Sequence, residues 1–413
     1  MATVPPRAFD AAAARADFPA LAQEVHGRPL AYLDNAATTQ MPEPVLEAVA
    51  RFGRRDRANV HRGVHALSER APAASAAARA AAQRFVNARE PHEIVFVRGA
   101  TEAINLVAHS FGRTAVGPGD EVLVSALEHH SNLVPWQMLC ADRGAELRVI
   151  PVTDEGELRL DDVEAALGPR ARLLAVTHVA NAIGTETPLA GIVAAARARA
   201  VPVLVDGAQA AAHLPIDVQA LGCDFYALSG HKVFGPTGLG VLYGRAERLA
   251  AMPPFMGGGE MVRSVAFTGA SYAAPPQRFE AGTPNIEGAV GLGAALAYVG
   301  ALDRAEVAAH EQRLLGHATQ RIAALPGVRI VGRAPRKAPI VSFVVDGVHP
   351  HDVGTILDQH GVAVRAGHHC AQPLLDRLGV GATVRASMAF YNSTADVDAL
   401  CAALEDVRRI FRR

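Results

Sequence analysis

The feature that most constrains the fold of this chain is a regular alternation of short apolar runs with longer Ala-rich stretches. This alternation is typical of βα units around a mostly parallel sheet. Runs such as Val203 to Val205 lack a polar residue at every second position, as expected of strands that helices cover on both faces. The predicted strands are Glu93–Val97, Glu121–Ser125, Leu147–Val152, Leu173–Thr177, Pro202–Asp206 and Phe225–Ser229. We therefore predict an α/β domain with a buried, mostly parallel sheet.

The rest of the chain predicts a second, smaller α+β domain. Between Met252 and Pro284 the sequence is rich in Pro and Gly, which indicates a long ordered loop rather than an element. A helix is predicted from about Ile286 to Ala324, and further elements follow at Ile340–Val345 (strand), His351–His360 (helix), Val362–Arg365 (strand) and Thr383–Phe390 (strand). The run from Ser393 to Asp396 resembles a helix N-cap box, and the apolar spacing after it predicts a closing amphipathic helix.

Length and charge exclude several classes of protein. The 413 residues are enough for two hydrophobic cores, and 40 basic against 41 acidic residues create no global field toward nucleic acid or membranes. Neither nucleic acid nor a membrane is therefore expected as a partner. Met1 to Asp17 lacks the features of a signal peptide, and no run of 18 apolar residues occurs, so a cytoplasmic location is expected. The widely spaced cysteines indicate reduced intracellular thiols rather than a disulfide framework.

Two charged residues follow buried strands of the predicted sheet at its carboxyl edge, where open α/β sheets bind ligands. Lys232 comes just after the strand Phe225–Ser229, and its amine can bind a carbonyl compound, although most lysines are simply solvated. Asp206 ends another apolar strand, where a carboxylate needs a partner. A pyridinium nitrogen suits it, because the carboxylate keeps the ring protonated and able to withdraw electrons. The alternative role for Asp206 is a helix N-cap without any ligand.

A glycine turn between a strand and a helix offers an anion site at the same edge. In the segment Val97–Ala103, the N–H groups of Ala100, Thr101 and Glu102 and the Thr101 hydroxyl can converge on a phosphate. The segment lacks the glycine and lysine spacings of nucleotide-binding loops, which disfavours a nucleotide. Many turns of this kind bind nothing, so this signal depends on the neighbouring ones.

Paired histidines follow the strand Glu121–Ser125. There, His129 can stack on an aromatic cofactor ring or move protons. Zinc is the alternative, since the chain holds several residues of the ligand types that zinc prefers: His129, His130, His368, His369 and Cys370. Adjacent side chains on a strand point to opposite faces, and no established zinc spacing is present, so we predict no metal.

One cysteine stands apart from the other three. Cys370 lies in the Gly- and Pro-bounded run Arg365–Pro373, whereas Cys140, Cys223 and Cys401 fall on or beside predicted elements and are expected to pack. A thiol exposed beside histidine and arginine has an increased thiolate fraction and can act as a nucleophile. The alternative is an incidental surface thiol.

Taken together, these motifs resemble a known family. Asp206, Gln209 and the run Ser229-Gly-His-Lys232 resemble the class V aminotransferase pattern of fold type I enzymes, and Arg365-Ala-Gly-His-His-Cys370 narrows the resemblance to SufS-type cysteine desulfurases. Segments that look like family motifs cover nearly the whole chain: Ala31–Ala37, Val60–Gly63, Glu128–His130, Val134–Gln137, Gly235–Gly238, Arg278–Asn285 and Arg385–Ser387. The resemblance implies a seven-stranded-type sheet in a large cofactor domain, residues 25–295. It also implies a small domain, residues 1–24 with 296–413, that carries the reactive cysteine loop.

The resemblance also implies a cofactor, pyridoxal 5'-phosphate, and a set of residues that hold it. Lys232 attaches it, Asp206 contacts its ring nitrogen, His129 stacks on the ring, and Gln209 bonds the phenolic oxygen. The implied phosphate contacts are Thr101, Ser229 and His231, joined by Thr283 of the neighbouring subunit in a homodimer. For the substrate, the resemblance implies that Arg385 grips the carboxylate, with Arg365 near the reactive loop and Asn181 beside the substrate.

The implied reaction converts L-cysteine to L-alanine and leaves the sulfur on Cys370 as a persulfide. Lys232 moves the Cα proton, and His129 is the candidate for proton transfer at the sulfur or the product carbon. The expected partners are a sulfur-acceptor protein of the SufE or SufU kind and the scaffold of iron-sulfur cluster assembly. Selenocysteine is a rival substrate, because its weaker C–Se bond demands less of a protein nucleophile.

Two further functions remain open from the residues alone. An aminotransferase would need a keto-acid acceptor and would leave Cys370 without a role. A non-catalytic scaffold that binds a partner would have no use for Lys232, Asp206 and Cys370 together.

Overall fold

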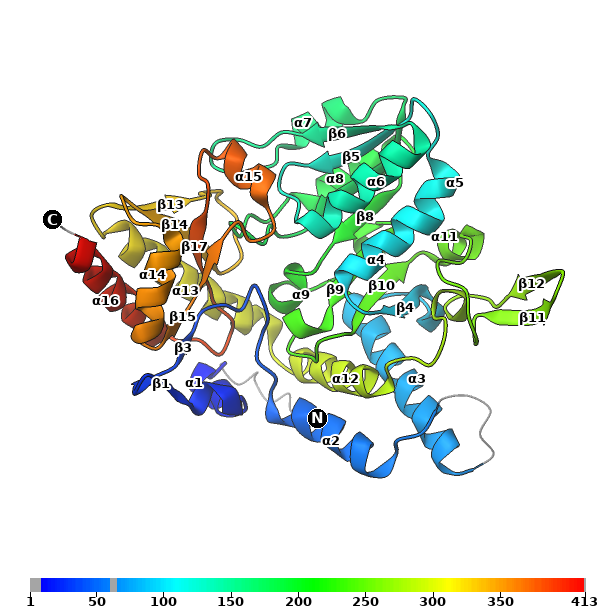
Figure 1. Ribbon diagram of the computed structural model, residues 1–413, viewed down its shortest axis with the longest axis horizontal. Helices are drawn as coiled ribbons and strands as arrows, with labels where there is room; N and C mark the ends of the chain where they lie inside the picture. Colours follow the sequence, from blue (N-terminus) through cyan, green and yellow to red (C-terminus); the bar gives the residue numbers. More distant parts are fainter. Residues whose placement is uncertain (1–8, 60–64, 412–413) are drawn as a thin grey trace, which may run out of the picture.

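A seven-stranded sheet forms the centre of the larger part of the chain (Figure 1). The computed structural model describes residues 9–59 and 65–411, so the family-like motif Val60–Gly63 lies outside the described residues. In order across the sheet, the strands are β4 (Ile94–Val97), β10 (Gly240–Gly244), β9 (Phe225–Ser229), β8 (Val203–Asp206), β7 (Ala171–Thr177), β5 (Glu121–Ser125) and β6 (Glu146–Ile150). The predicted mostly parallel sheet and its six predicted strands are confirmed.

The seventh strand, β10, was not predicted from the sequence. It pairs antiparallel with both β4 and β9 and is buried along its whole length. Glycines end the short run Gly-Val-Leu-Tyr-Gly, so its pattern resembles a turn. Gly240 is required by packing, since a Cβ there would lie 2.6 Å from the Cα of Gly99 on the adjoining turn.

Both faces of this sheet are covered by helices. In β7, Leu174 and Val176 face one apolar cluster, while Leu173 and Ala175 face another on the opposite side. The first cluster includes residues of α3 (Leu67–Val86), α7 (Leu160–Ala166), α8 (Leu189–Ala198) and α12 (Ile286–Gly300). The second includes residues of α4 (Ala100–Val107) and α6 (Val134–Arg143). Because both faces are apolar and covered, polar groups of the strands are left to the strand ends.

A second, antiparallel sheet forms the smaller part of the chain and confirms the predicted α+β region. Its strands, in order, are β13 (Val328–Val331), β14 (Ile340–Val345), β17 (Thr383–Ser387) and β16 (Arg365–Gly367). The helices beside it are α13 (Arg304–Ala323), α14 (Pro350–Gln359) and α16 (Thr394–Phe411). The predicted cap of α16 is present, since the Asp396 carboxylate accepts the Ser393 N–H at 2.8 Å.

Several predicted boundaries were wrong. The strand expected over Thr383–Phe390 ends at Ser387, and the strand expected over Val362–Arg365 is split into β15 (Val362–Ala363) and β16. The loop predicted between Met252 and Pro284 contains an antiparallel hairpin of β11 (Val262–Ala266) and β12 (Gly269–Tyr272). This hairpin projects from the molecule (Figure 1), and its largely exposed strands lack the apolar alternation that predicts a half-buried strand.

The single helix predicted from Ile286 to Ala324 was also wrong, because α12 and α13 meet at 84°. Asp303 causes the break: its carboxylate accepts the N–H groups of Ala305 and Glu306 at 3.0 and 3.2 Å and caps a new helix. Within the described residues no single helix is long and apolar enough to cross a membrane, and the pair α12 and α13 passes that test only when both are counted together.

The N-terminal segment after Pro29 lies against the second sheet. β3 (Ala31–Tyr32) pairs in parallel with β15, and Asp34 bridges to Ser387. Ala31 and Leu33 belong to the apolar cluster of the second sheet. This segment falls within the predicted large domain, residues 25–295, but packs on the second sheet. The division of the chain into two domains stays a prediction.

The segment that carries Cys370 connects the two sheets. It leaves β16 of the second sheet and enters α15 (Gln372–Arg377). Ala371, Leu374 and Leu375 are buried in the apolar cluster of the first sheet. Cys370 is thus held between elements of both sheets.

One ion pair ties the edge of the first sheet to the segment before α12. Arg79 forms two hydrogen bonds of 2.8 Å with Glu280, and Glu280 also accepts the Phe96 N–H. Both side chains are largely buried, so Glu280→Ala leaves an arginine buried without its carboxylate. We expect a loss of about 2 to 4 kcal/mol in the free energy of unfolding, measured by urea denaturation. Asp142→Ala, which removes the exposed pair with Arg113, is the control and should cost less than about 1 kcal/mol; equal losses would contradict the prediction.

Candidate active site

A cavity of about 290 Å³ lies at the carboxyl ends of the central strands and extends to the second sheet. Of the predicted site residues, all but Thr283 line it: Thr101, His129, Asn181, Asp206, Gln209, Ser229, His231, Lys232, Arg365, Cys370 and Arg385. They come from nearly the whole length of the chain. The fold therefore brings together residues that the sequence linked only through separate motifs.

Asp206 is buried at the floor of this cavity. Its Oδ1 accepts the Ala208 N–H at 3.0 Å, while the following helix, α9 (Ala210–His213), begins after Gln209. The N-cap alternative for Asp206 is therefore wrong. Burial raises the pKa of the carboxyl, so its charged form needs a cation nearby, such as a pyridinium nitrogen.

Lys232 lines the same cavity and is one of only two lysines in the chain. Burial lowers its pKa to about 8, with Asp206 opposing that shift. Its amine is therefore partly neutral, and nucleophilic, near pH 8. The other lysine, Lys337, also has a pKa lowered to about 8 by burial, but it donates to the Gly332 carbonyl and does not line the cavity. Position, rather than pKa, distinguishes the two amines.

The glycine turn after β4 contributes Ala100 and Thr101 to the wall of the cavity. The Ala100 N–H donates to the Ser229 hydroxyl at 2.9 Å, so this N–H is already engaged rather than free for an anion. Thr101 and His231 line the cavity here, but Glu102 does not, since its carboxylate accepts the Arg98 N–H. Of the three predicted N–H donors, that of Ala100 is thus taken by Ser229, and an anion contact from Thr101 stays a prediction.

Of the two neighbouring histidines, only the first lines the cavity. His129 lines the cavity, and its Nδ1 accepts the Ser131 N–H at 3.0 Å. Burial lowers its pKa to about 3, so the ring is neutral at pH 7 and carries its proton on Nε2. Gln209 also lines the cavity and donates one amide hydrogen to the Ala36 carbonyl at 2.6 Å.

Glu128 does not line the cavity but supports its wall, and the sequence analysis gave it no role of its own. It is buried beside His129 and accepts from the Ser125 hydroxyl, the Asn132 amide and the Thr177 N–H. Burial raises its pKa to about 8, so it is mostly protonated at pH 7. These bonds hold the histidine segment against the ends of β5 and β7. An acidic residue directly before paired histidines at a strand end is the signal that points to it.

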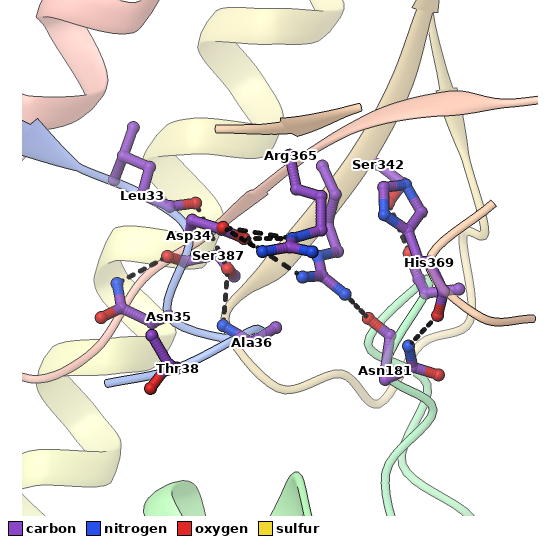
Figure 2. A network of polar contacts seen from close by, with 12 residues as sticks. Leu33, Asp34, Asn35, Ala36, Thr38, Asn181, Ser342, Arg365, His369 and Ser387 are labelled. Atoms are coloured by element: carbon purple, nitrogen blue, oxygen red, sulfur yellow. Dashed lines mark hydrogen bonds and ion pairs between the residues drawn. The ribbon is translucent and has the colours of Figure 1, made fainter. Parts of the chain in front are cut away.

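Asp34, also missed, joins the two predicted substrate arginines. Figure 2 shows its carboxylate facing Arg365, whose Nε and Nη2 lie 3.2 and 3.0 Å from the Asp34 oxygens. Arg385 donates to Asp34 at 3.3 Å and to the Asn181 carbonyl at 3.0 Å. Burial lowers the pKa of Arg385 to about 10, which leaves it charged at pH 7. The signal for Asp34 is an acid at the end of the run Ala31–Leu33.

Cys370 is exposed and lines the cavity, whereas the three other cysteines are buried. His369 and Cys370 are consecutive residues with φ values of 53° and 54°. Non-glycine residues rarely adopt this left-handed conformation, and two in succession indicate a segment held in place by its surroundings.

Thr283 is exposed and lines a different cavity, with Arg98 and Glu102 among its neighbours. Its predicted phosphate contact concerns a second subunit and stays a prediction. For the zinc alternative, the described residues contain no group of three or more His, Cys, Asp or Glu side chains that could hold a metal ion.

The residues of the cavity fit pyridoxal phosphate and an amino acid. Asp206 suits the ring nitrogen and Lys232 the aldehyde, while the Ser229 and Thr101 hydroxyls suit the phosphate. Three buried atoms of cavity residues, Nε of Arg385, Oδ1 of Asn181 and Nδ1 of His369, have no hydrogen-bond partner in the described part of the chain. Buried polar atoms of this kind normally find a partner, and an amino-acid substrate would supply one.

Known proteins resemble this chain over nearly its full length. The family model for aminotransferase class V matches residues 31–400. A cysteine desulfurase of Klebsiella pneumoniae is 53% identical over 403 residues, which cover 97% of this chain and 99% of the relative. One of Dickeya dadantii is 52% identical over 397 residues, with 96% of each chain covered.

Solved structures of cysteine desulfurases also resemble this chain. The cysteine desulfurase CsdA of Escherichia coli, solved in an S-sulfonic acid form, has a TM-score of 0.91 and 42% identity, covering 98% of this chain and all of that one. A lysine-to-alanine mutant of C-DES, at 25% identity and a TM-score of 0.81 over 95% of this chain and 99% of that one, was solved with glycine covalently linked to its PLP cofactor. The chain therefore belongs to the aminotransferase class V family, within its cysteine desulfurase group, and pyridoxal 5'-phosphate is its cofactor.

Proposed function

We propose that this enzyme converts L-cysteine to L-alanine and transfers the sulfur to Cys370 as a persulfide. The observation that carries the proposal is one cavity lined by both the amine of Lys232 and the exposed thiol of Cys370. An aminotransferase would have no use for that thiol, and a binding scaffold would have no use for a lysine whose pKa is lowered to about 8 beside a buried carboxylate.

Substrate binding is assigned to the arginine side of the cavity. Arg385 is held by Asp34 and the Asn181 carbonyl, which leaves its unpartnered Nε as a donor for the substrate carboxylate. An arginine fixed in this way binds a carboxylate with little further loss of side-chain freedom. Asn181 Oδ1 is the matching acceptor for a substrate N–H.

Proton transfer is assigned to two neutral groups, an amine that accepts a proton and an imidazole that donates one. When bound, pyridoxal phosphate supplies an electron sink for the bonds at the substrate Cα, and Asp206 maintains the charge on its ring nitrogen. The neutral amine of Lys232 accepts the Cα proton and returns it to the product. His129, neutral with its proton on Nε2, is the proposed donor to the carbon that loses sulfur.

Sulfur transfer forms one bond to sulfur and breaks another. The Cys370 thiolate attacks the substrate sulfur, so an S–S bond forms and the C–S bond breaks. The electron pair of the C–S bond stays with the substrate carbon, which takes a proton and becomes the methyl group of alanine. The sulfur remains on Cys370 as a persulfide, and no external oxidant or reductant is needed.

Several finer assignments rest on the family likeness and remain proposals. They are a homodimer in which Thr283 reaches the neighbouring phosphate, a sulfur acceptor of the SufE or SufU kind, delivery to an iron-sulfur scaffold, and a cytoplasmic location. Selenocysteine is a second proposed substrate. The exposure of Cys370 supports the acceptor, since a persulfide there is open to a partner.

The sulfur nucleophile is tested by mass. After incubation with cysteine, the intact wild-type protein should gain one sulfur atom while alanine is released. Cys370→Ala should keep the visible absorption of bound cofactor but lose the mass gain and at least about 100-fold in alanine formation. Cys140→Ala, which removes a buried thiol, is the control and should keep the gain. Normal desulfuration by the Cys370 variant would refute the assignment.

The cofactor lysine is tested with the two lysines of the chain. Lys232→Ala should abolish cofactor absorption and turnover, whereas Lys337→Arg should retain both. Reduction of the holoenzyme with borohydride and peptide mapping should place the cofactor on Lys232 alone. Label on Lys337 would contradict the assignment.

Cofactor capture should depend on pH through the Lys232 amine. Its pKa is lowered from 10.5 to about 8, so the nucleophilic neutral form is mostly present above pH 8 and declines about tenfold per pH unit well below it. The rate at which apoprotein binds pyridoxal phosphate, followed by absorption, should therefore rise up to about pH 8 and then level off. A rate that continues to rise to pH 10 would contradict the lowered pKa.

A further inference from the structure

The segment Gly367–Gln372, here called the cysteine loop, is held by residues that neither bind the cofactor nor react. The His130 N–H donates to the Cys370 carbonyl at 2.7 Å, and the His130 Nε2 accepts the Gln372 N–H at 3.3 Å. The Asn181 amide donates to the His369 carbonyl at 2.6 Å (Figure 2). Three consecutive peptide units around the reactive thiol are thus tied to the first sheet's strand ends.

A fourth contact holds the loop from the other side. His369 is buried, and its Nε2 lies 2.8 Å from the Thr383 hydroxyl on β17. Burial lowers the pKa of His369 to about 3, so this ring is neutral and packs rather than titrates near pH 7. His368, in contrast, is exposed and takes no part in these four contacts.

The backbone conformation explains why such contacts are needed. His369 and Cys370 both have positive φ, a conformation that is disfavoured for any residue with a Cβ. The loop therefore tends to relax unless bonds on both sides oppose it. Relaxation at these two residues would rotate the Cys370 side chain away from its place on the cavity wall.

We propose that His130 and Asn181 form a clamp that holds the cysteine loop in this conformation and so positions the Cys370 thiol for attack on the substrate sulfur. The inference rests on the proposed desulfuration and adds two positioning residues to it. Asn181 has a double function. Its main-chain carbonyl accepts a hydrogen bond from Arg385, while its side-chain amide donates one to the cysteine loop. It couples the arginine that grips the substrate to the thiol that attacks it.

The His130 side chain offers the cleaner test, because it touches the loop through one acceptor atom. His130→Leu removes the acceptor for the Gln372 N–H, whereas His130→Gln retains an acceptor at similar reach. His368→Gln, in the same loop but outside the clamp, is the matched control. Asn181→Ala tests the third contact, and Thr383→Val against Thr383→Ser tests the fourth without touching the first sheet.

Hydrogen exchange measured on holoenzyme without substrate reports on the clamp independently of the reaction. Peptides covering residues 367–378 should exchange at least about tenfold faster in His130→Leu and Asn181→Ala, and at the wild-type rate in His130→Gln and His368→Gln. The rate at which iodoacetamide alkylates Cys370 should differ from the wild-type rate in His130→Leu and Asn181→Ala. Unchanged exchange in both His130→Leu and Asn181→Ala would overturn the clamp, even if the enzyme desulfurates cysteine normally.

Turnover links the clamp to sulfur transfer. His130→Leu should lower kcat for cysteine about 10- to 100-fold with unchanged cofactor absorption, and His130→Gln should restore most of it. In a Cys370→Ala background, the same leucine substitution should have no further effect on selenocysteine turnover, because its effect acts through the thiol. An equal loss in that background would overturn the positioning role. Wild-type protein that releases no alanine from cysteine would instead refute the proposed function, while the exchange experiment would still decide the clamp.

Discussion

Burial of both faces of the central sheet is the constraint on which the rest of the structure depends. Helices cover each face, and strands β8 and β9 are buried along their whole length, with apolar residues at every position but the last. A charged group has no low-energy place within those strands, so the reactive polar groups lie at their carboxyl ends. Asp206 closes β8 and Lys232 follows β9, which pair as parallel neighbours. The cavity is therefore a consequence of how the sheet is covered.

Burial then sets the chemistry of the groups that reach this edge. It raises the pKa of Asp206 and of Glu128, lowers that of Lys232 to about 8, and keeps His129 neutral. The same physical cause thus produces a carboxylate that needs a cation, an amine that can accept a proton, and an imidazole that can donate one. Lys337 has a similarly lowered pKa but lies away from the cavity, so burial alone does not place an amine at the site.

The second sheet completes the cavity by supplying two arginines and the Cys370 thiol. Asp34 joins Arg365 and Arg385, and the cysteine loop continues from β16 into a helix that packs on the first sheet. Contacts from both sheets therefore hold the Cys370 thiol. Both His369 and Cys370 have the left-handed backbone conformation, which is disfavoured for residues with a Cβ. A nucleophile held in this way keeps its place beside the cavity without being buried.

The sequence by itself determined the mostly parallel sheet, because long apolar runs that alternate with helical stretches have few other solutions. It also predicted Lys232, Asp206 and Cys370 as site residues from residue types that are unusual at strand ends and in a Gly-bounded loop, and the structure places all three on one cavity. It missed β10, whose flanking glycines mimic a turn, and the break at Asp303, where a local cap overrides a continuous helical pattern. Only the tertiary structure showed the contacts of Asp34, Glu128 and His130, because their partners lie far away in the chain or arise from the way the elements pack. Such long-range pairing leaves no local periodicity, and a single sequence therefore does not reveal it.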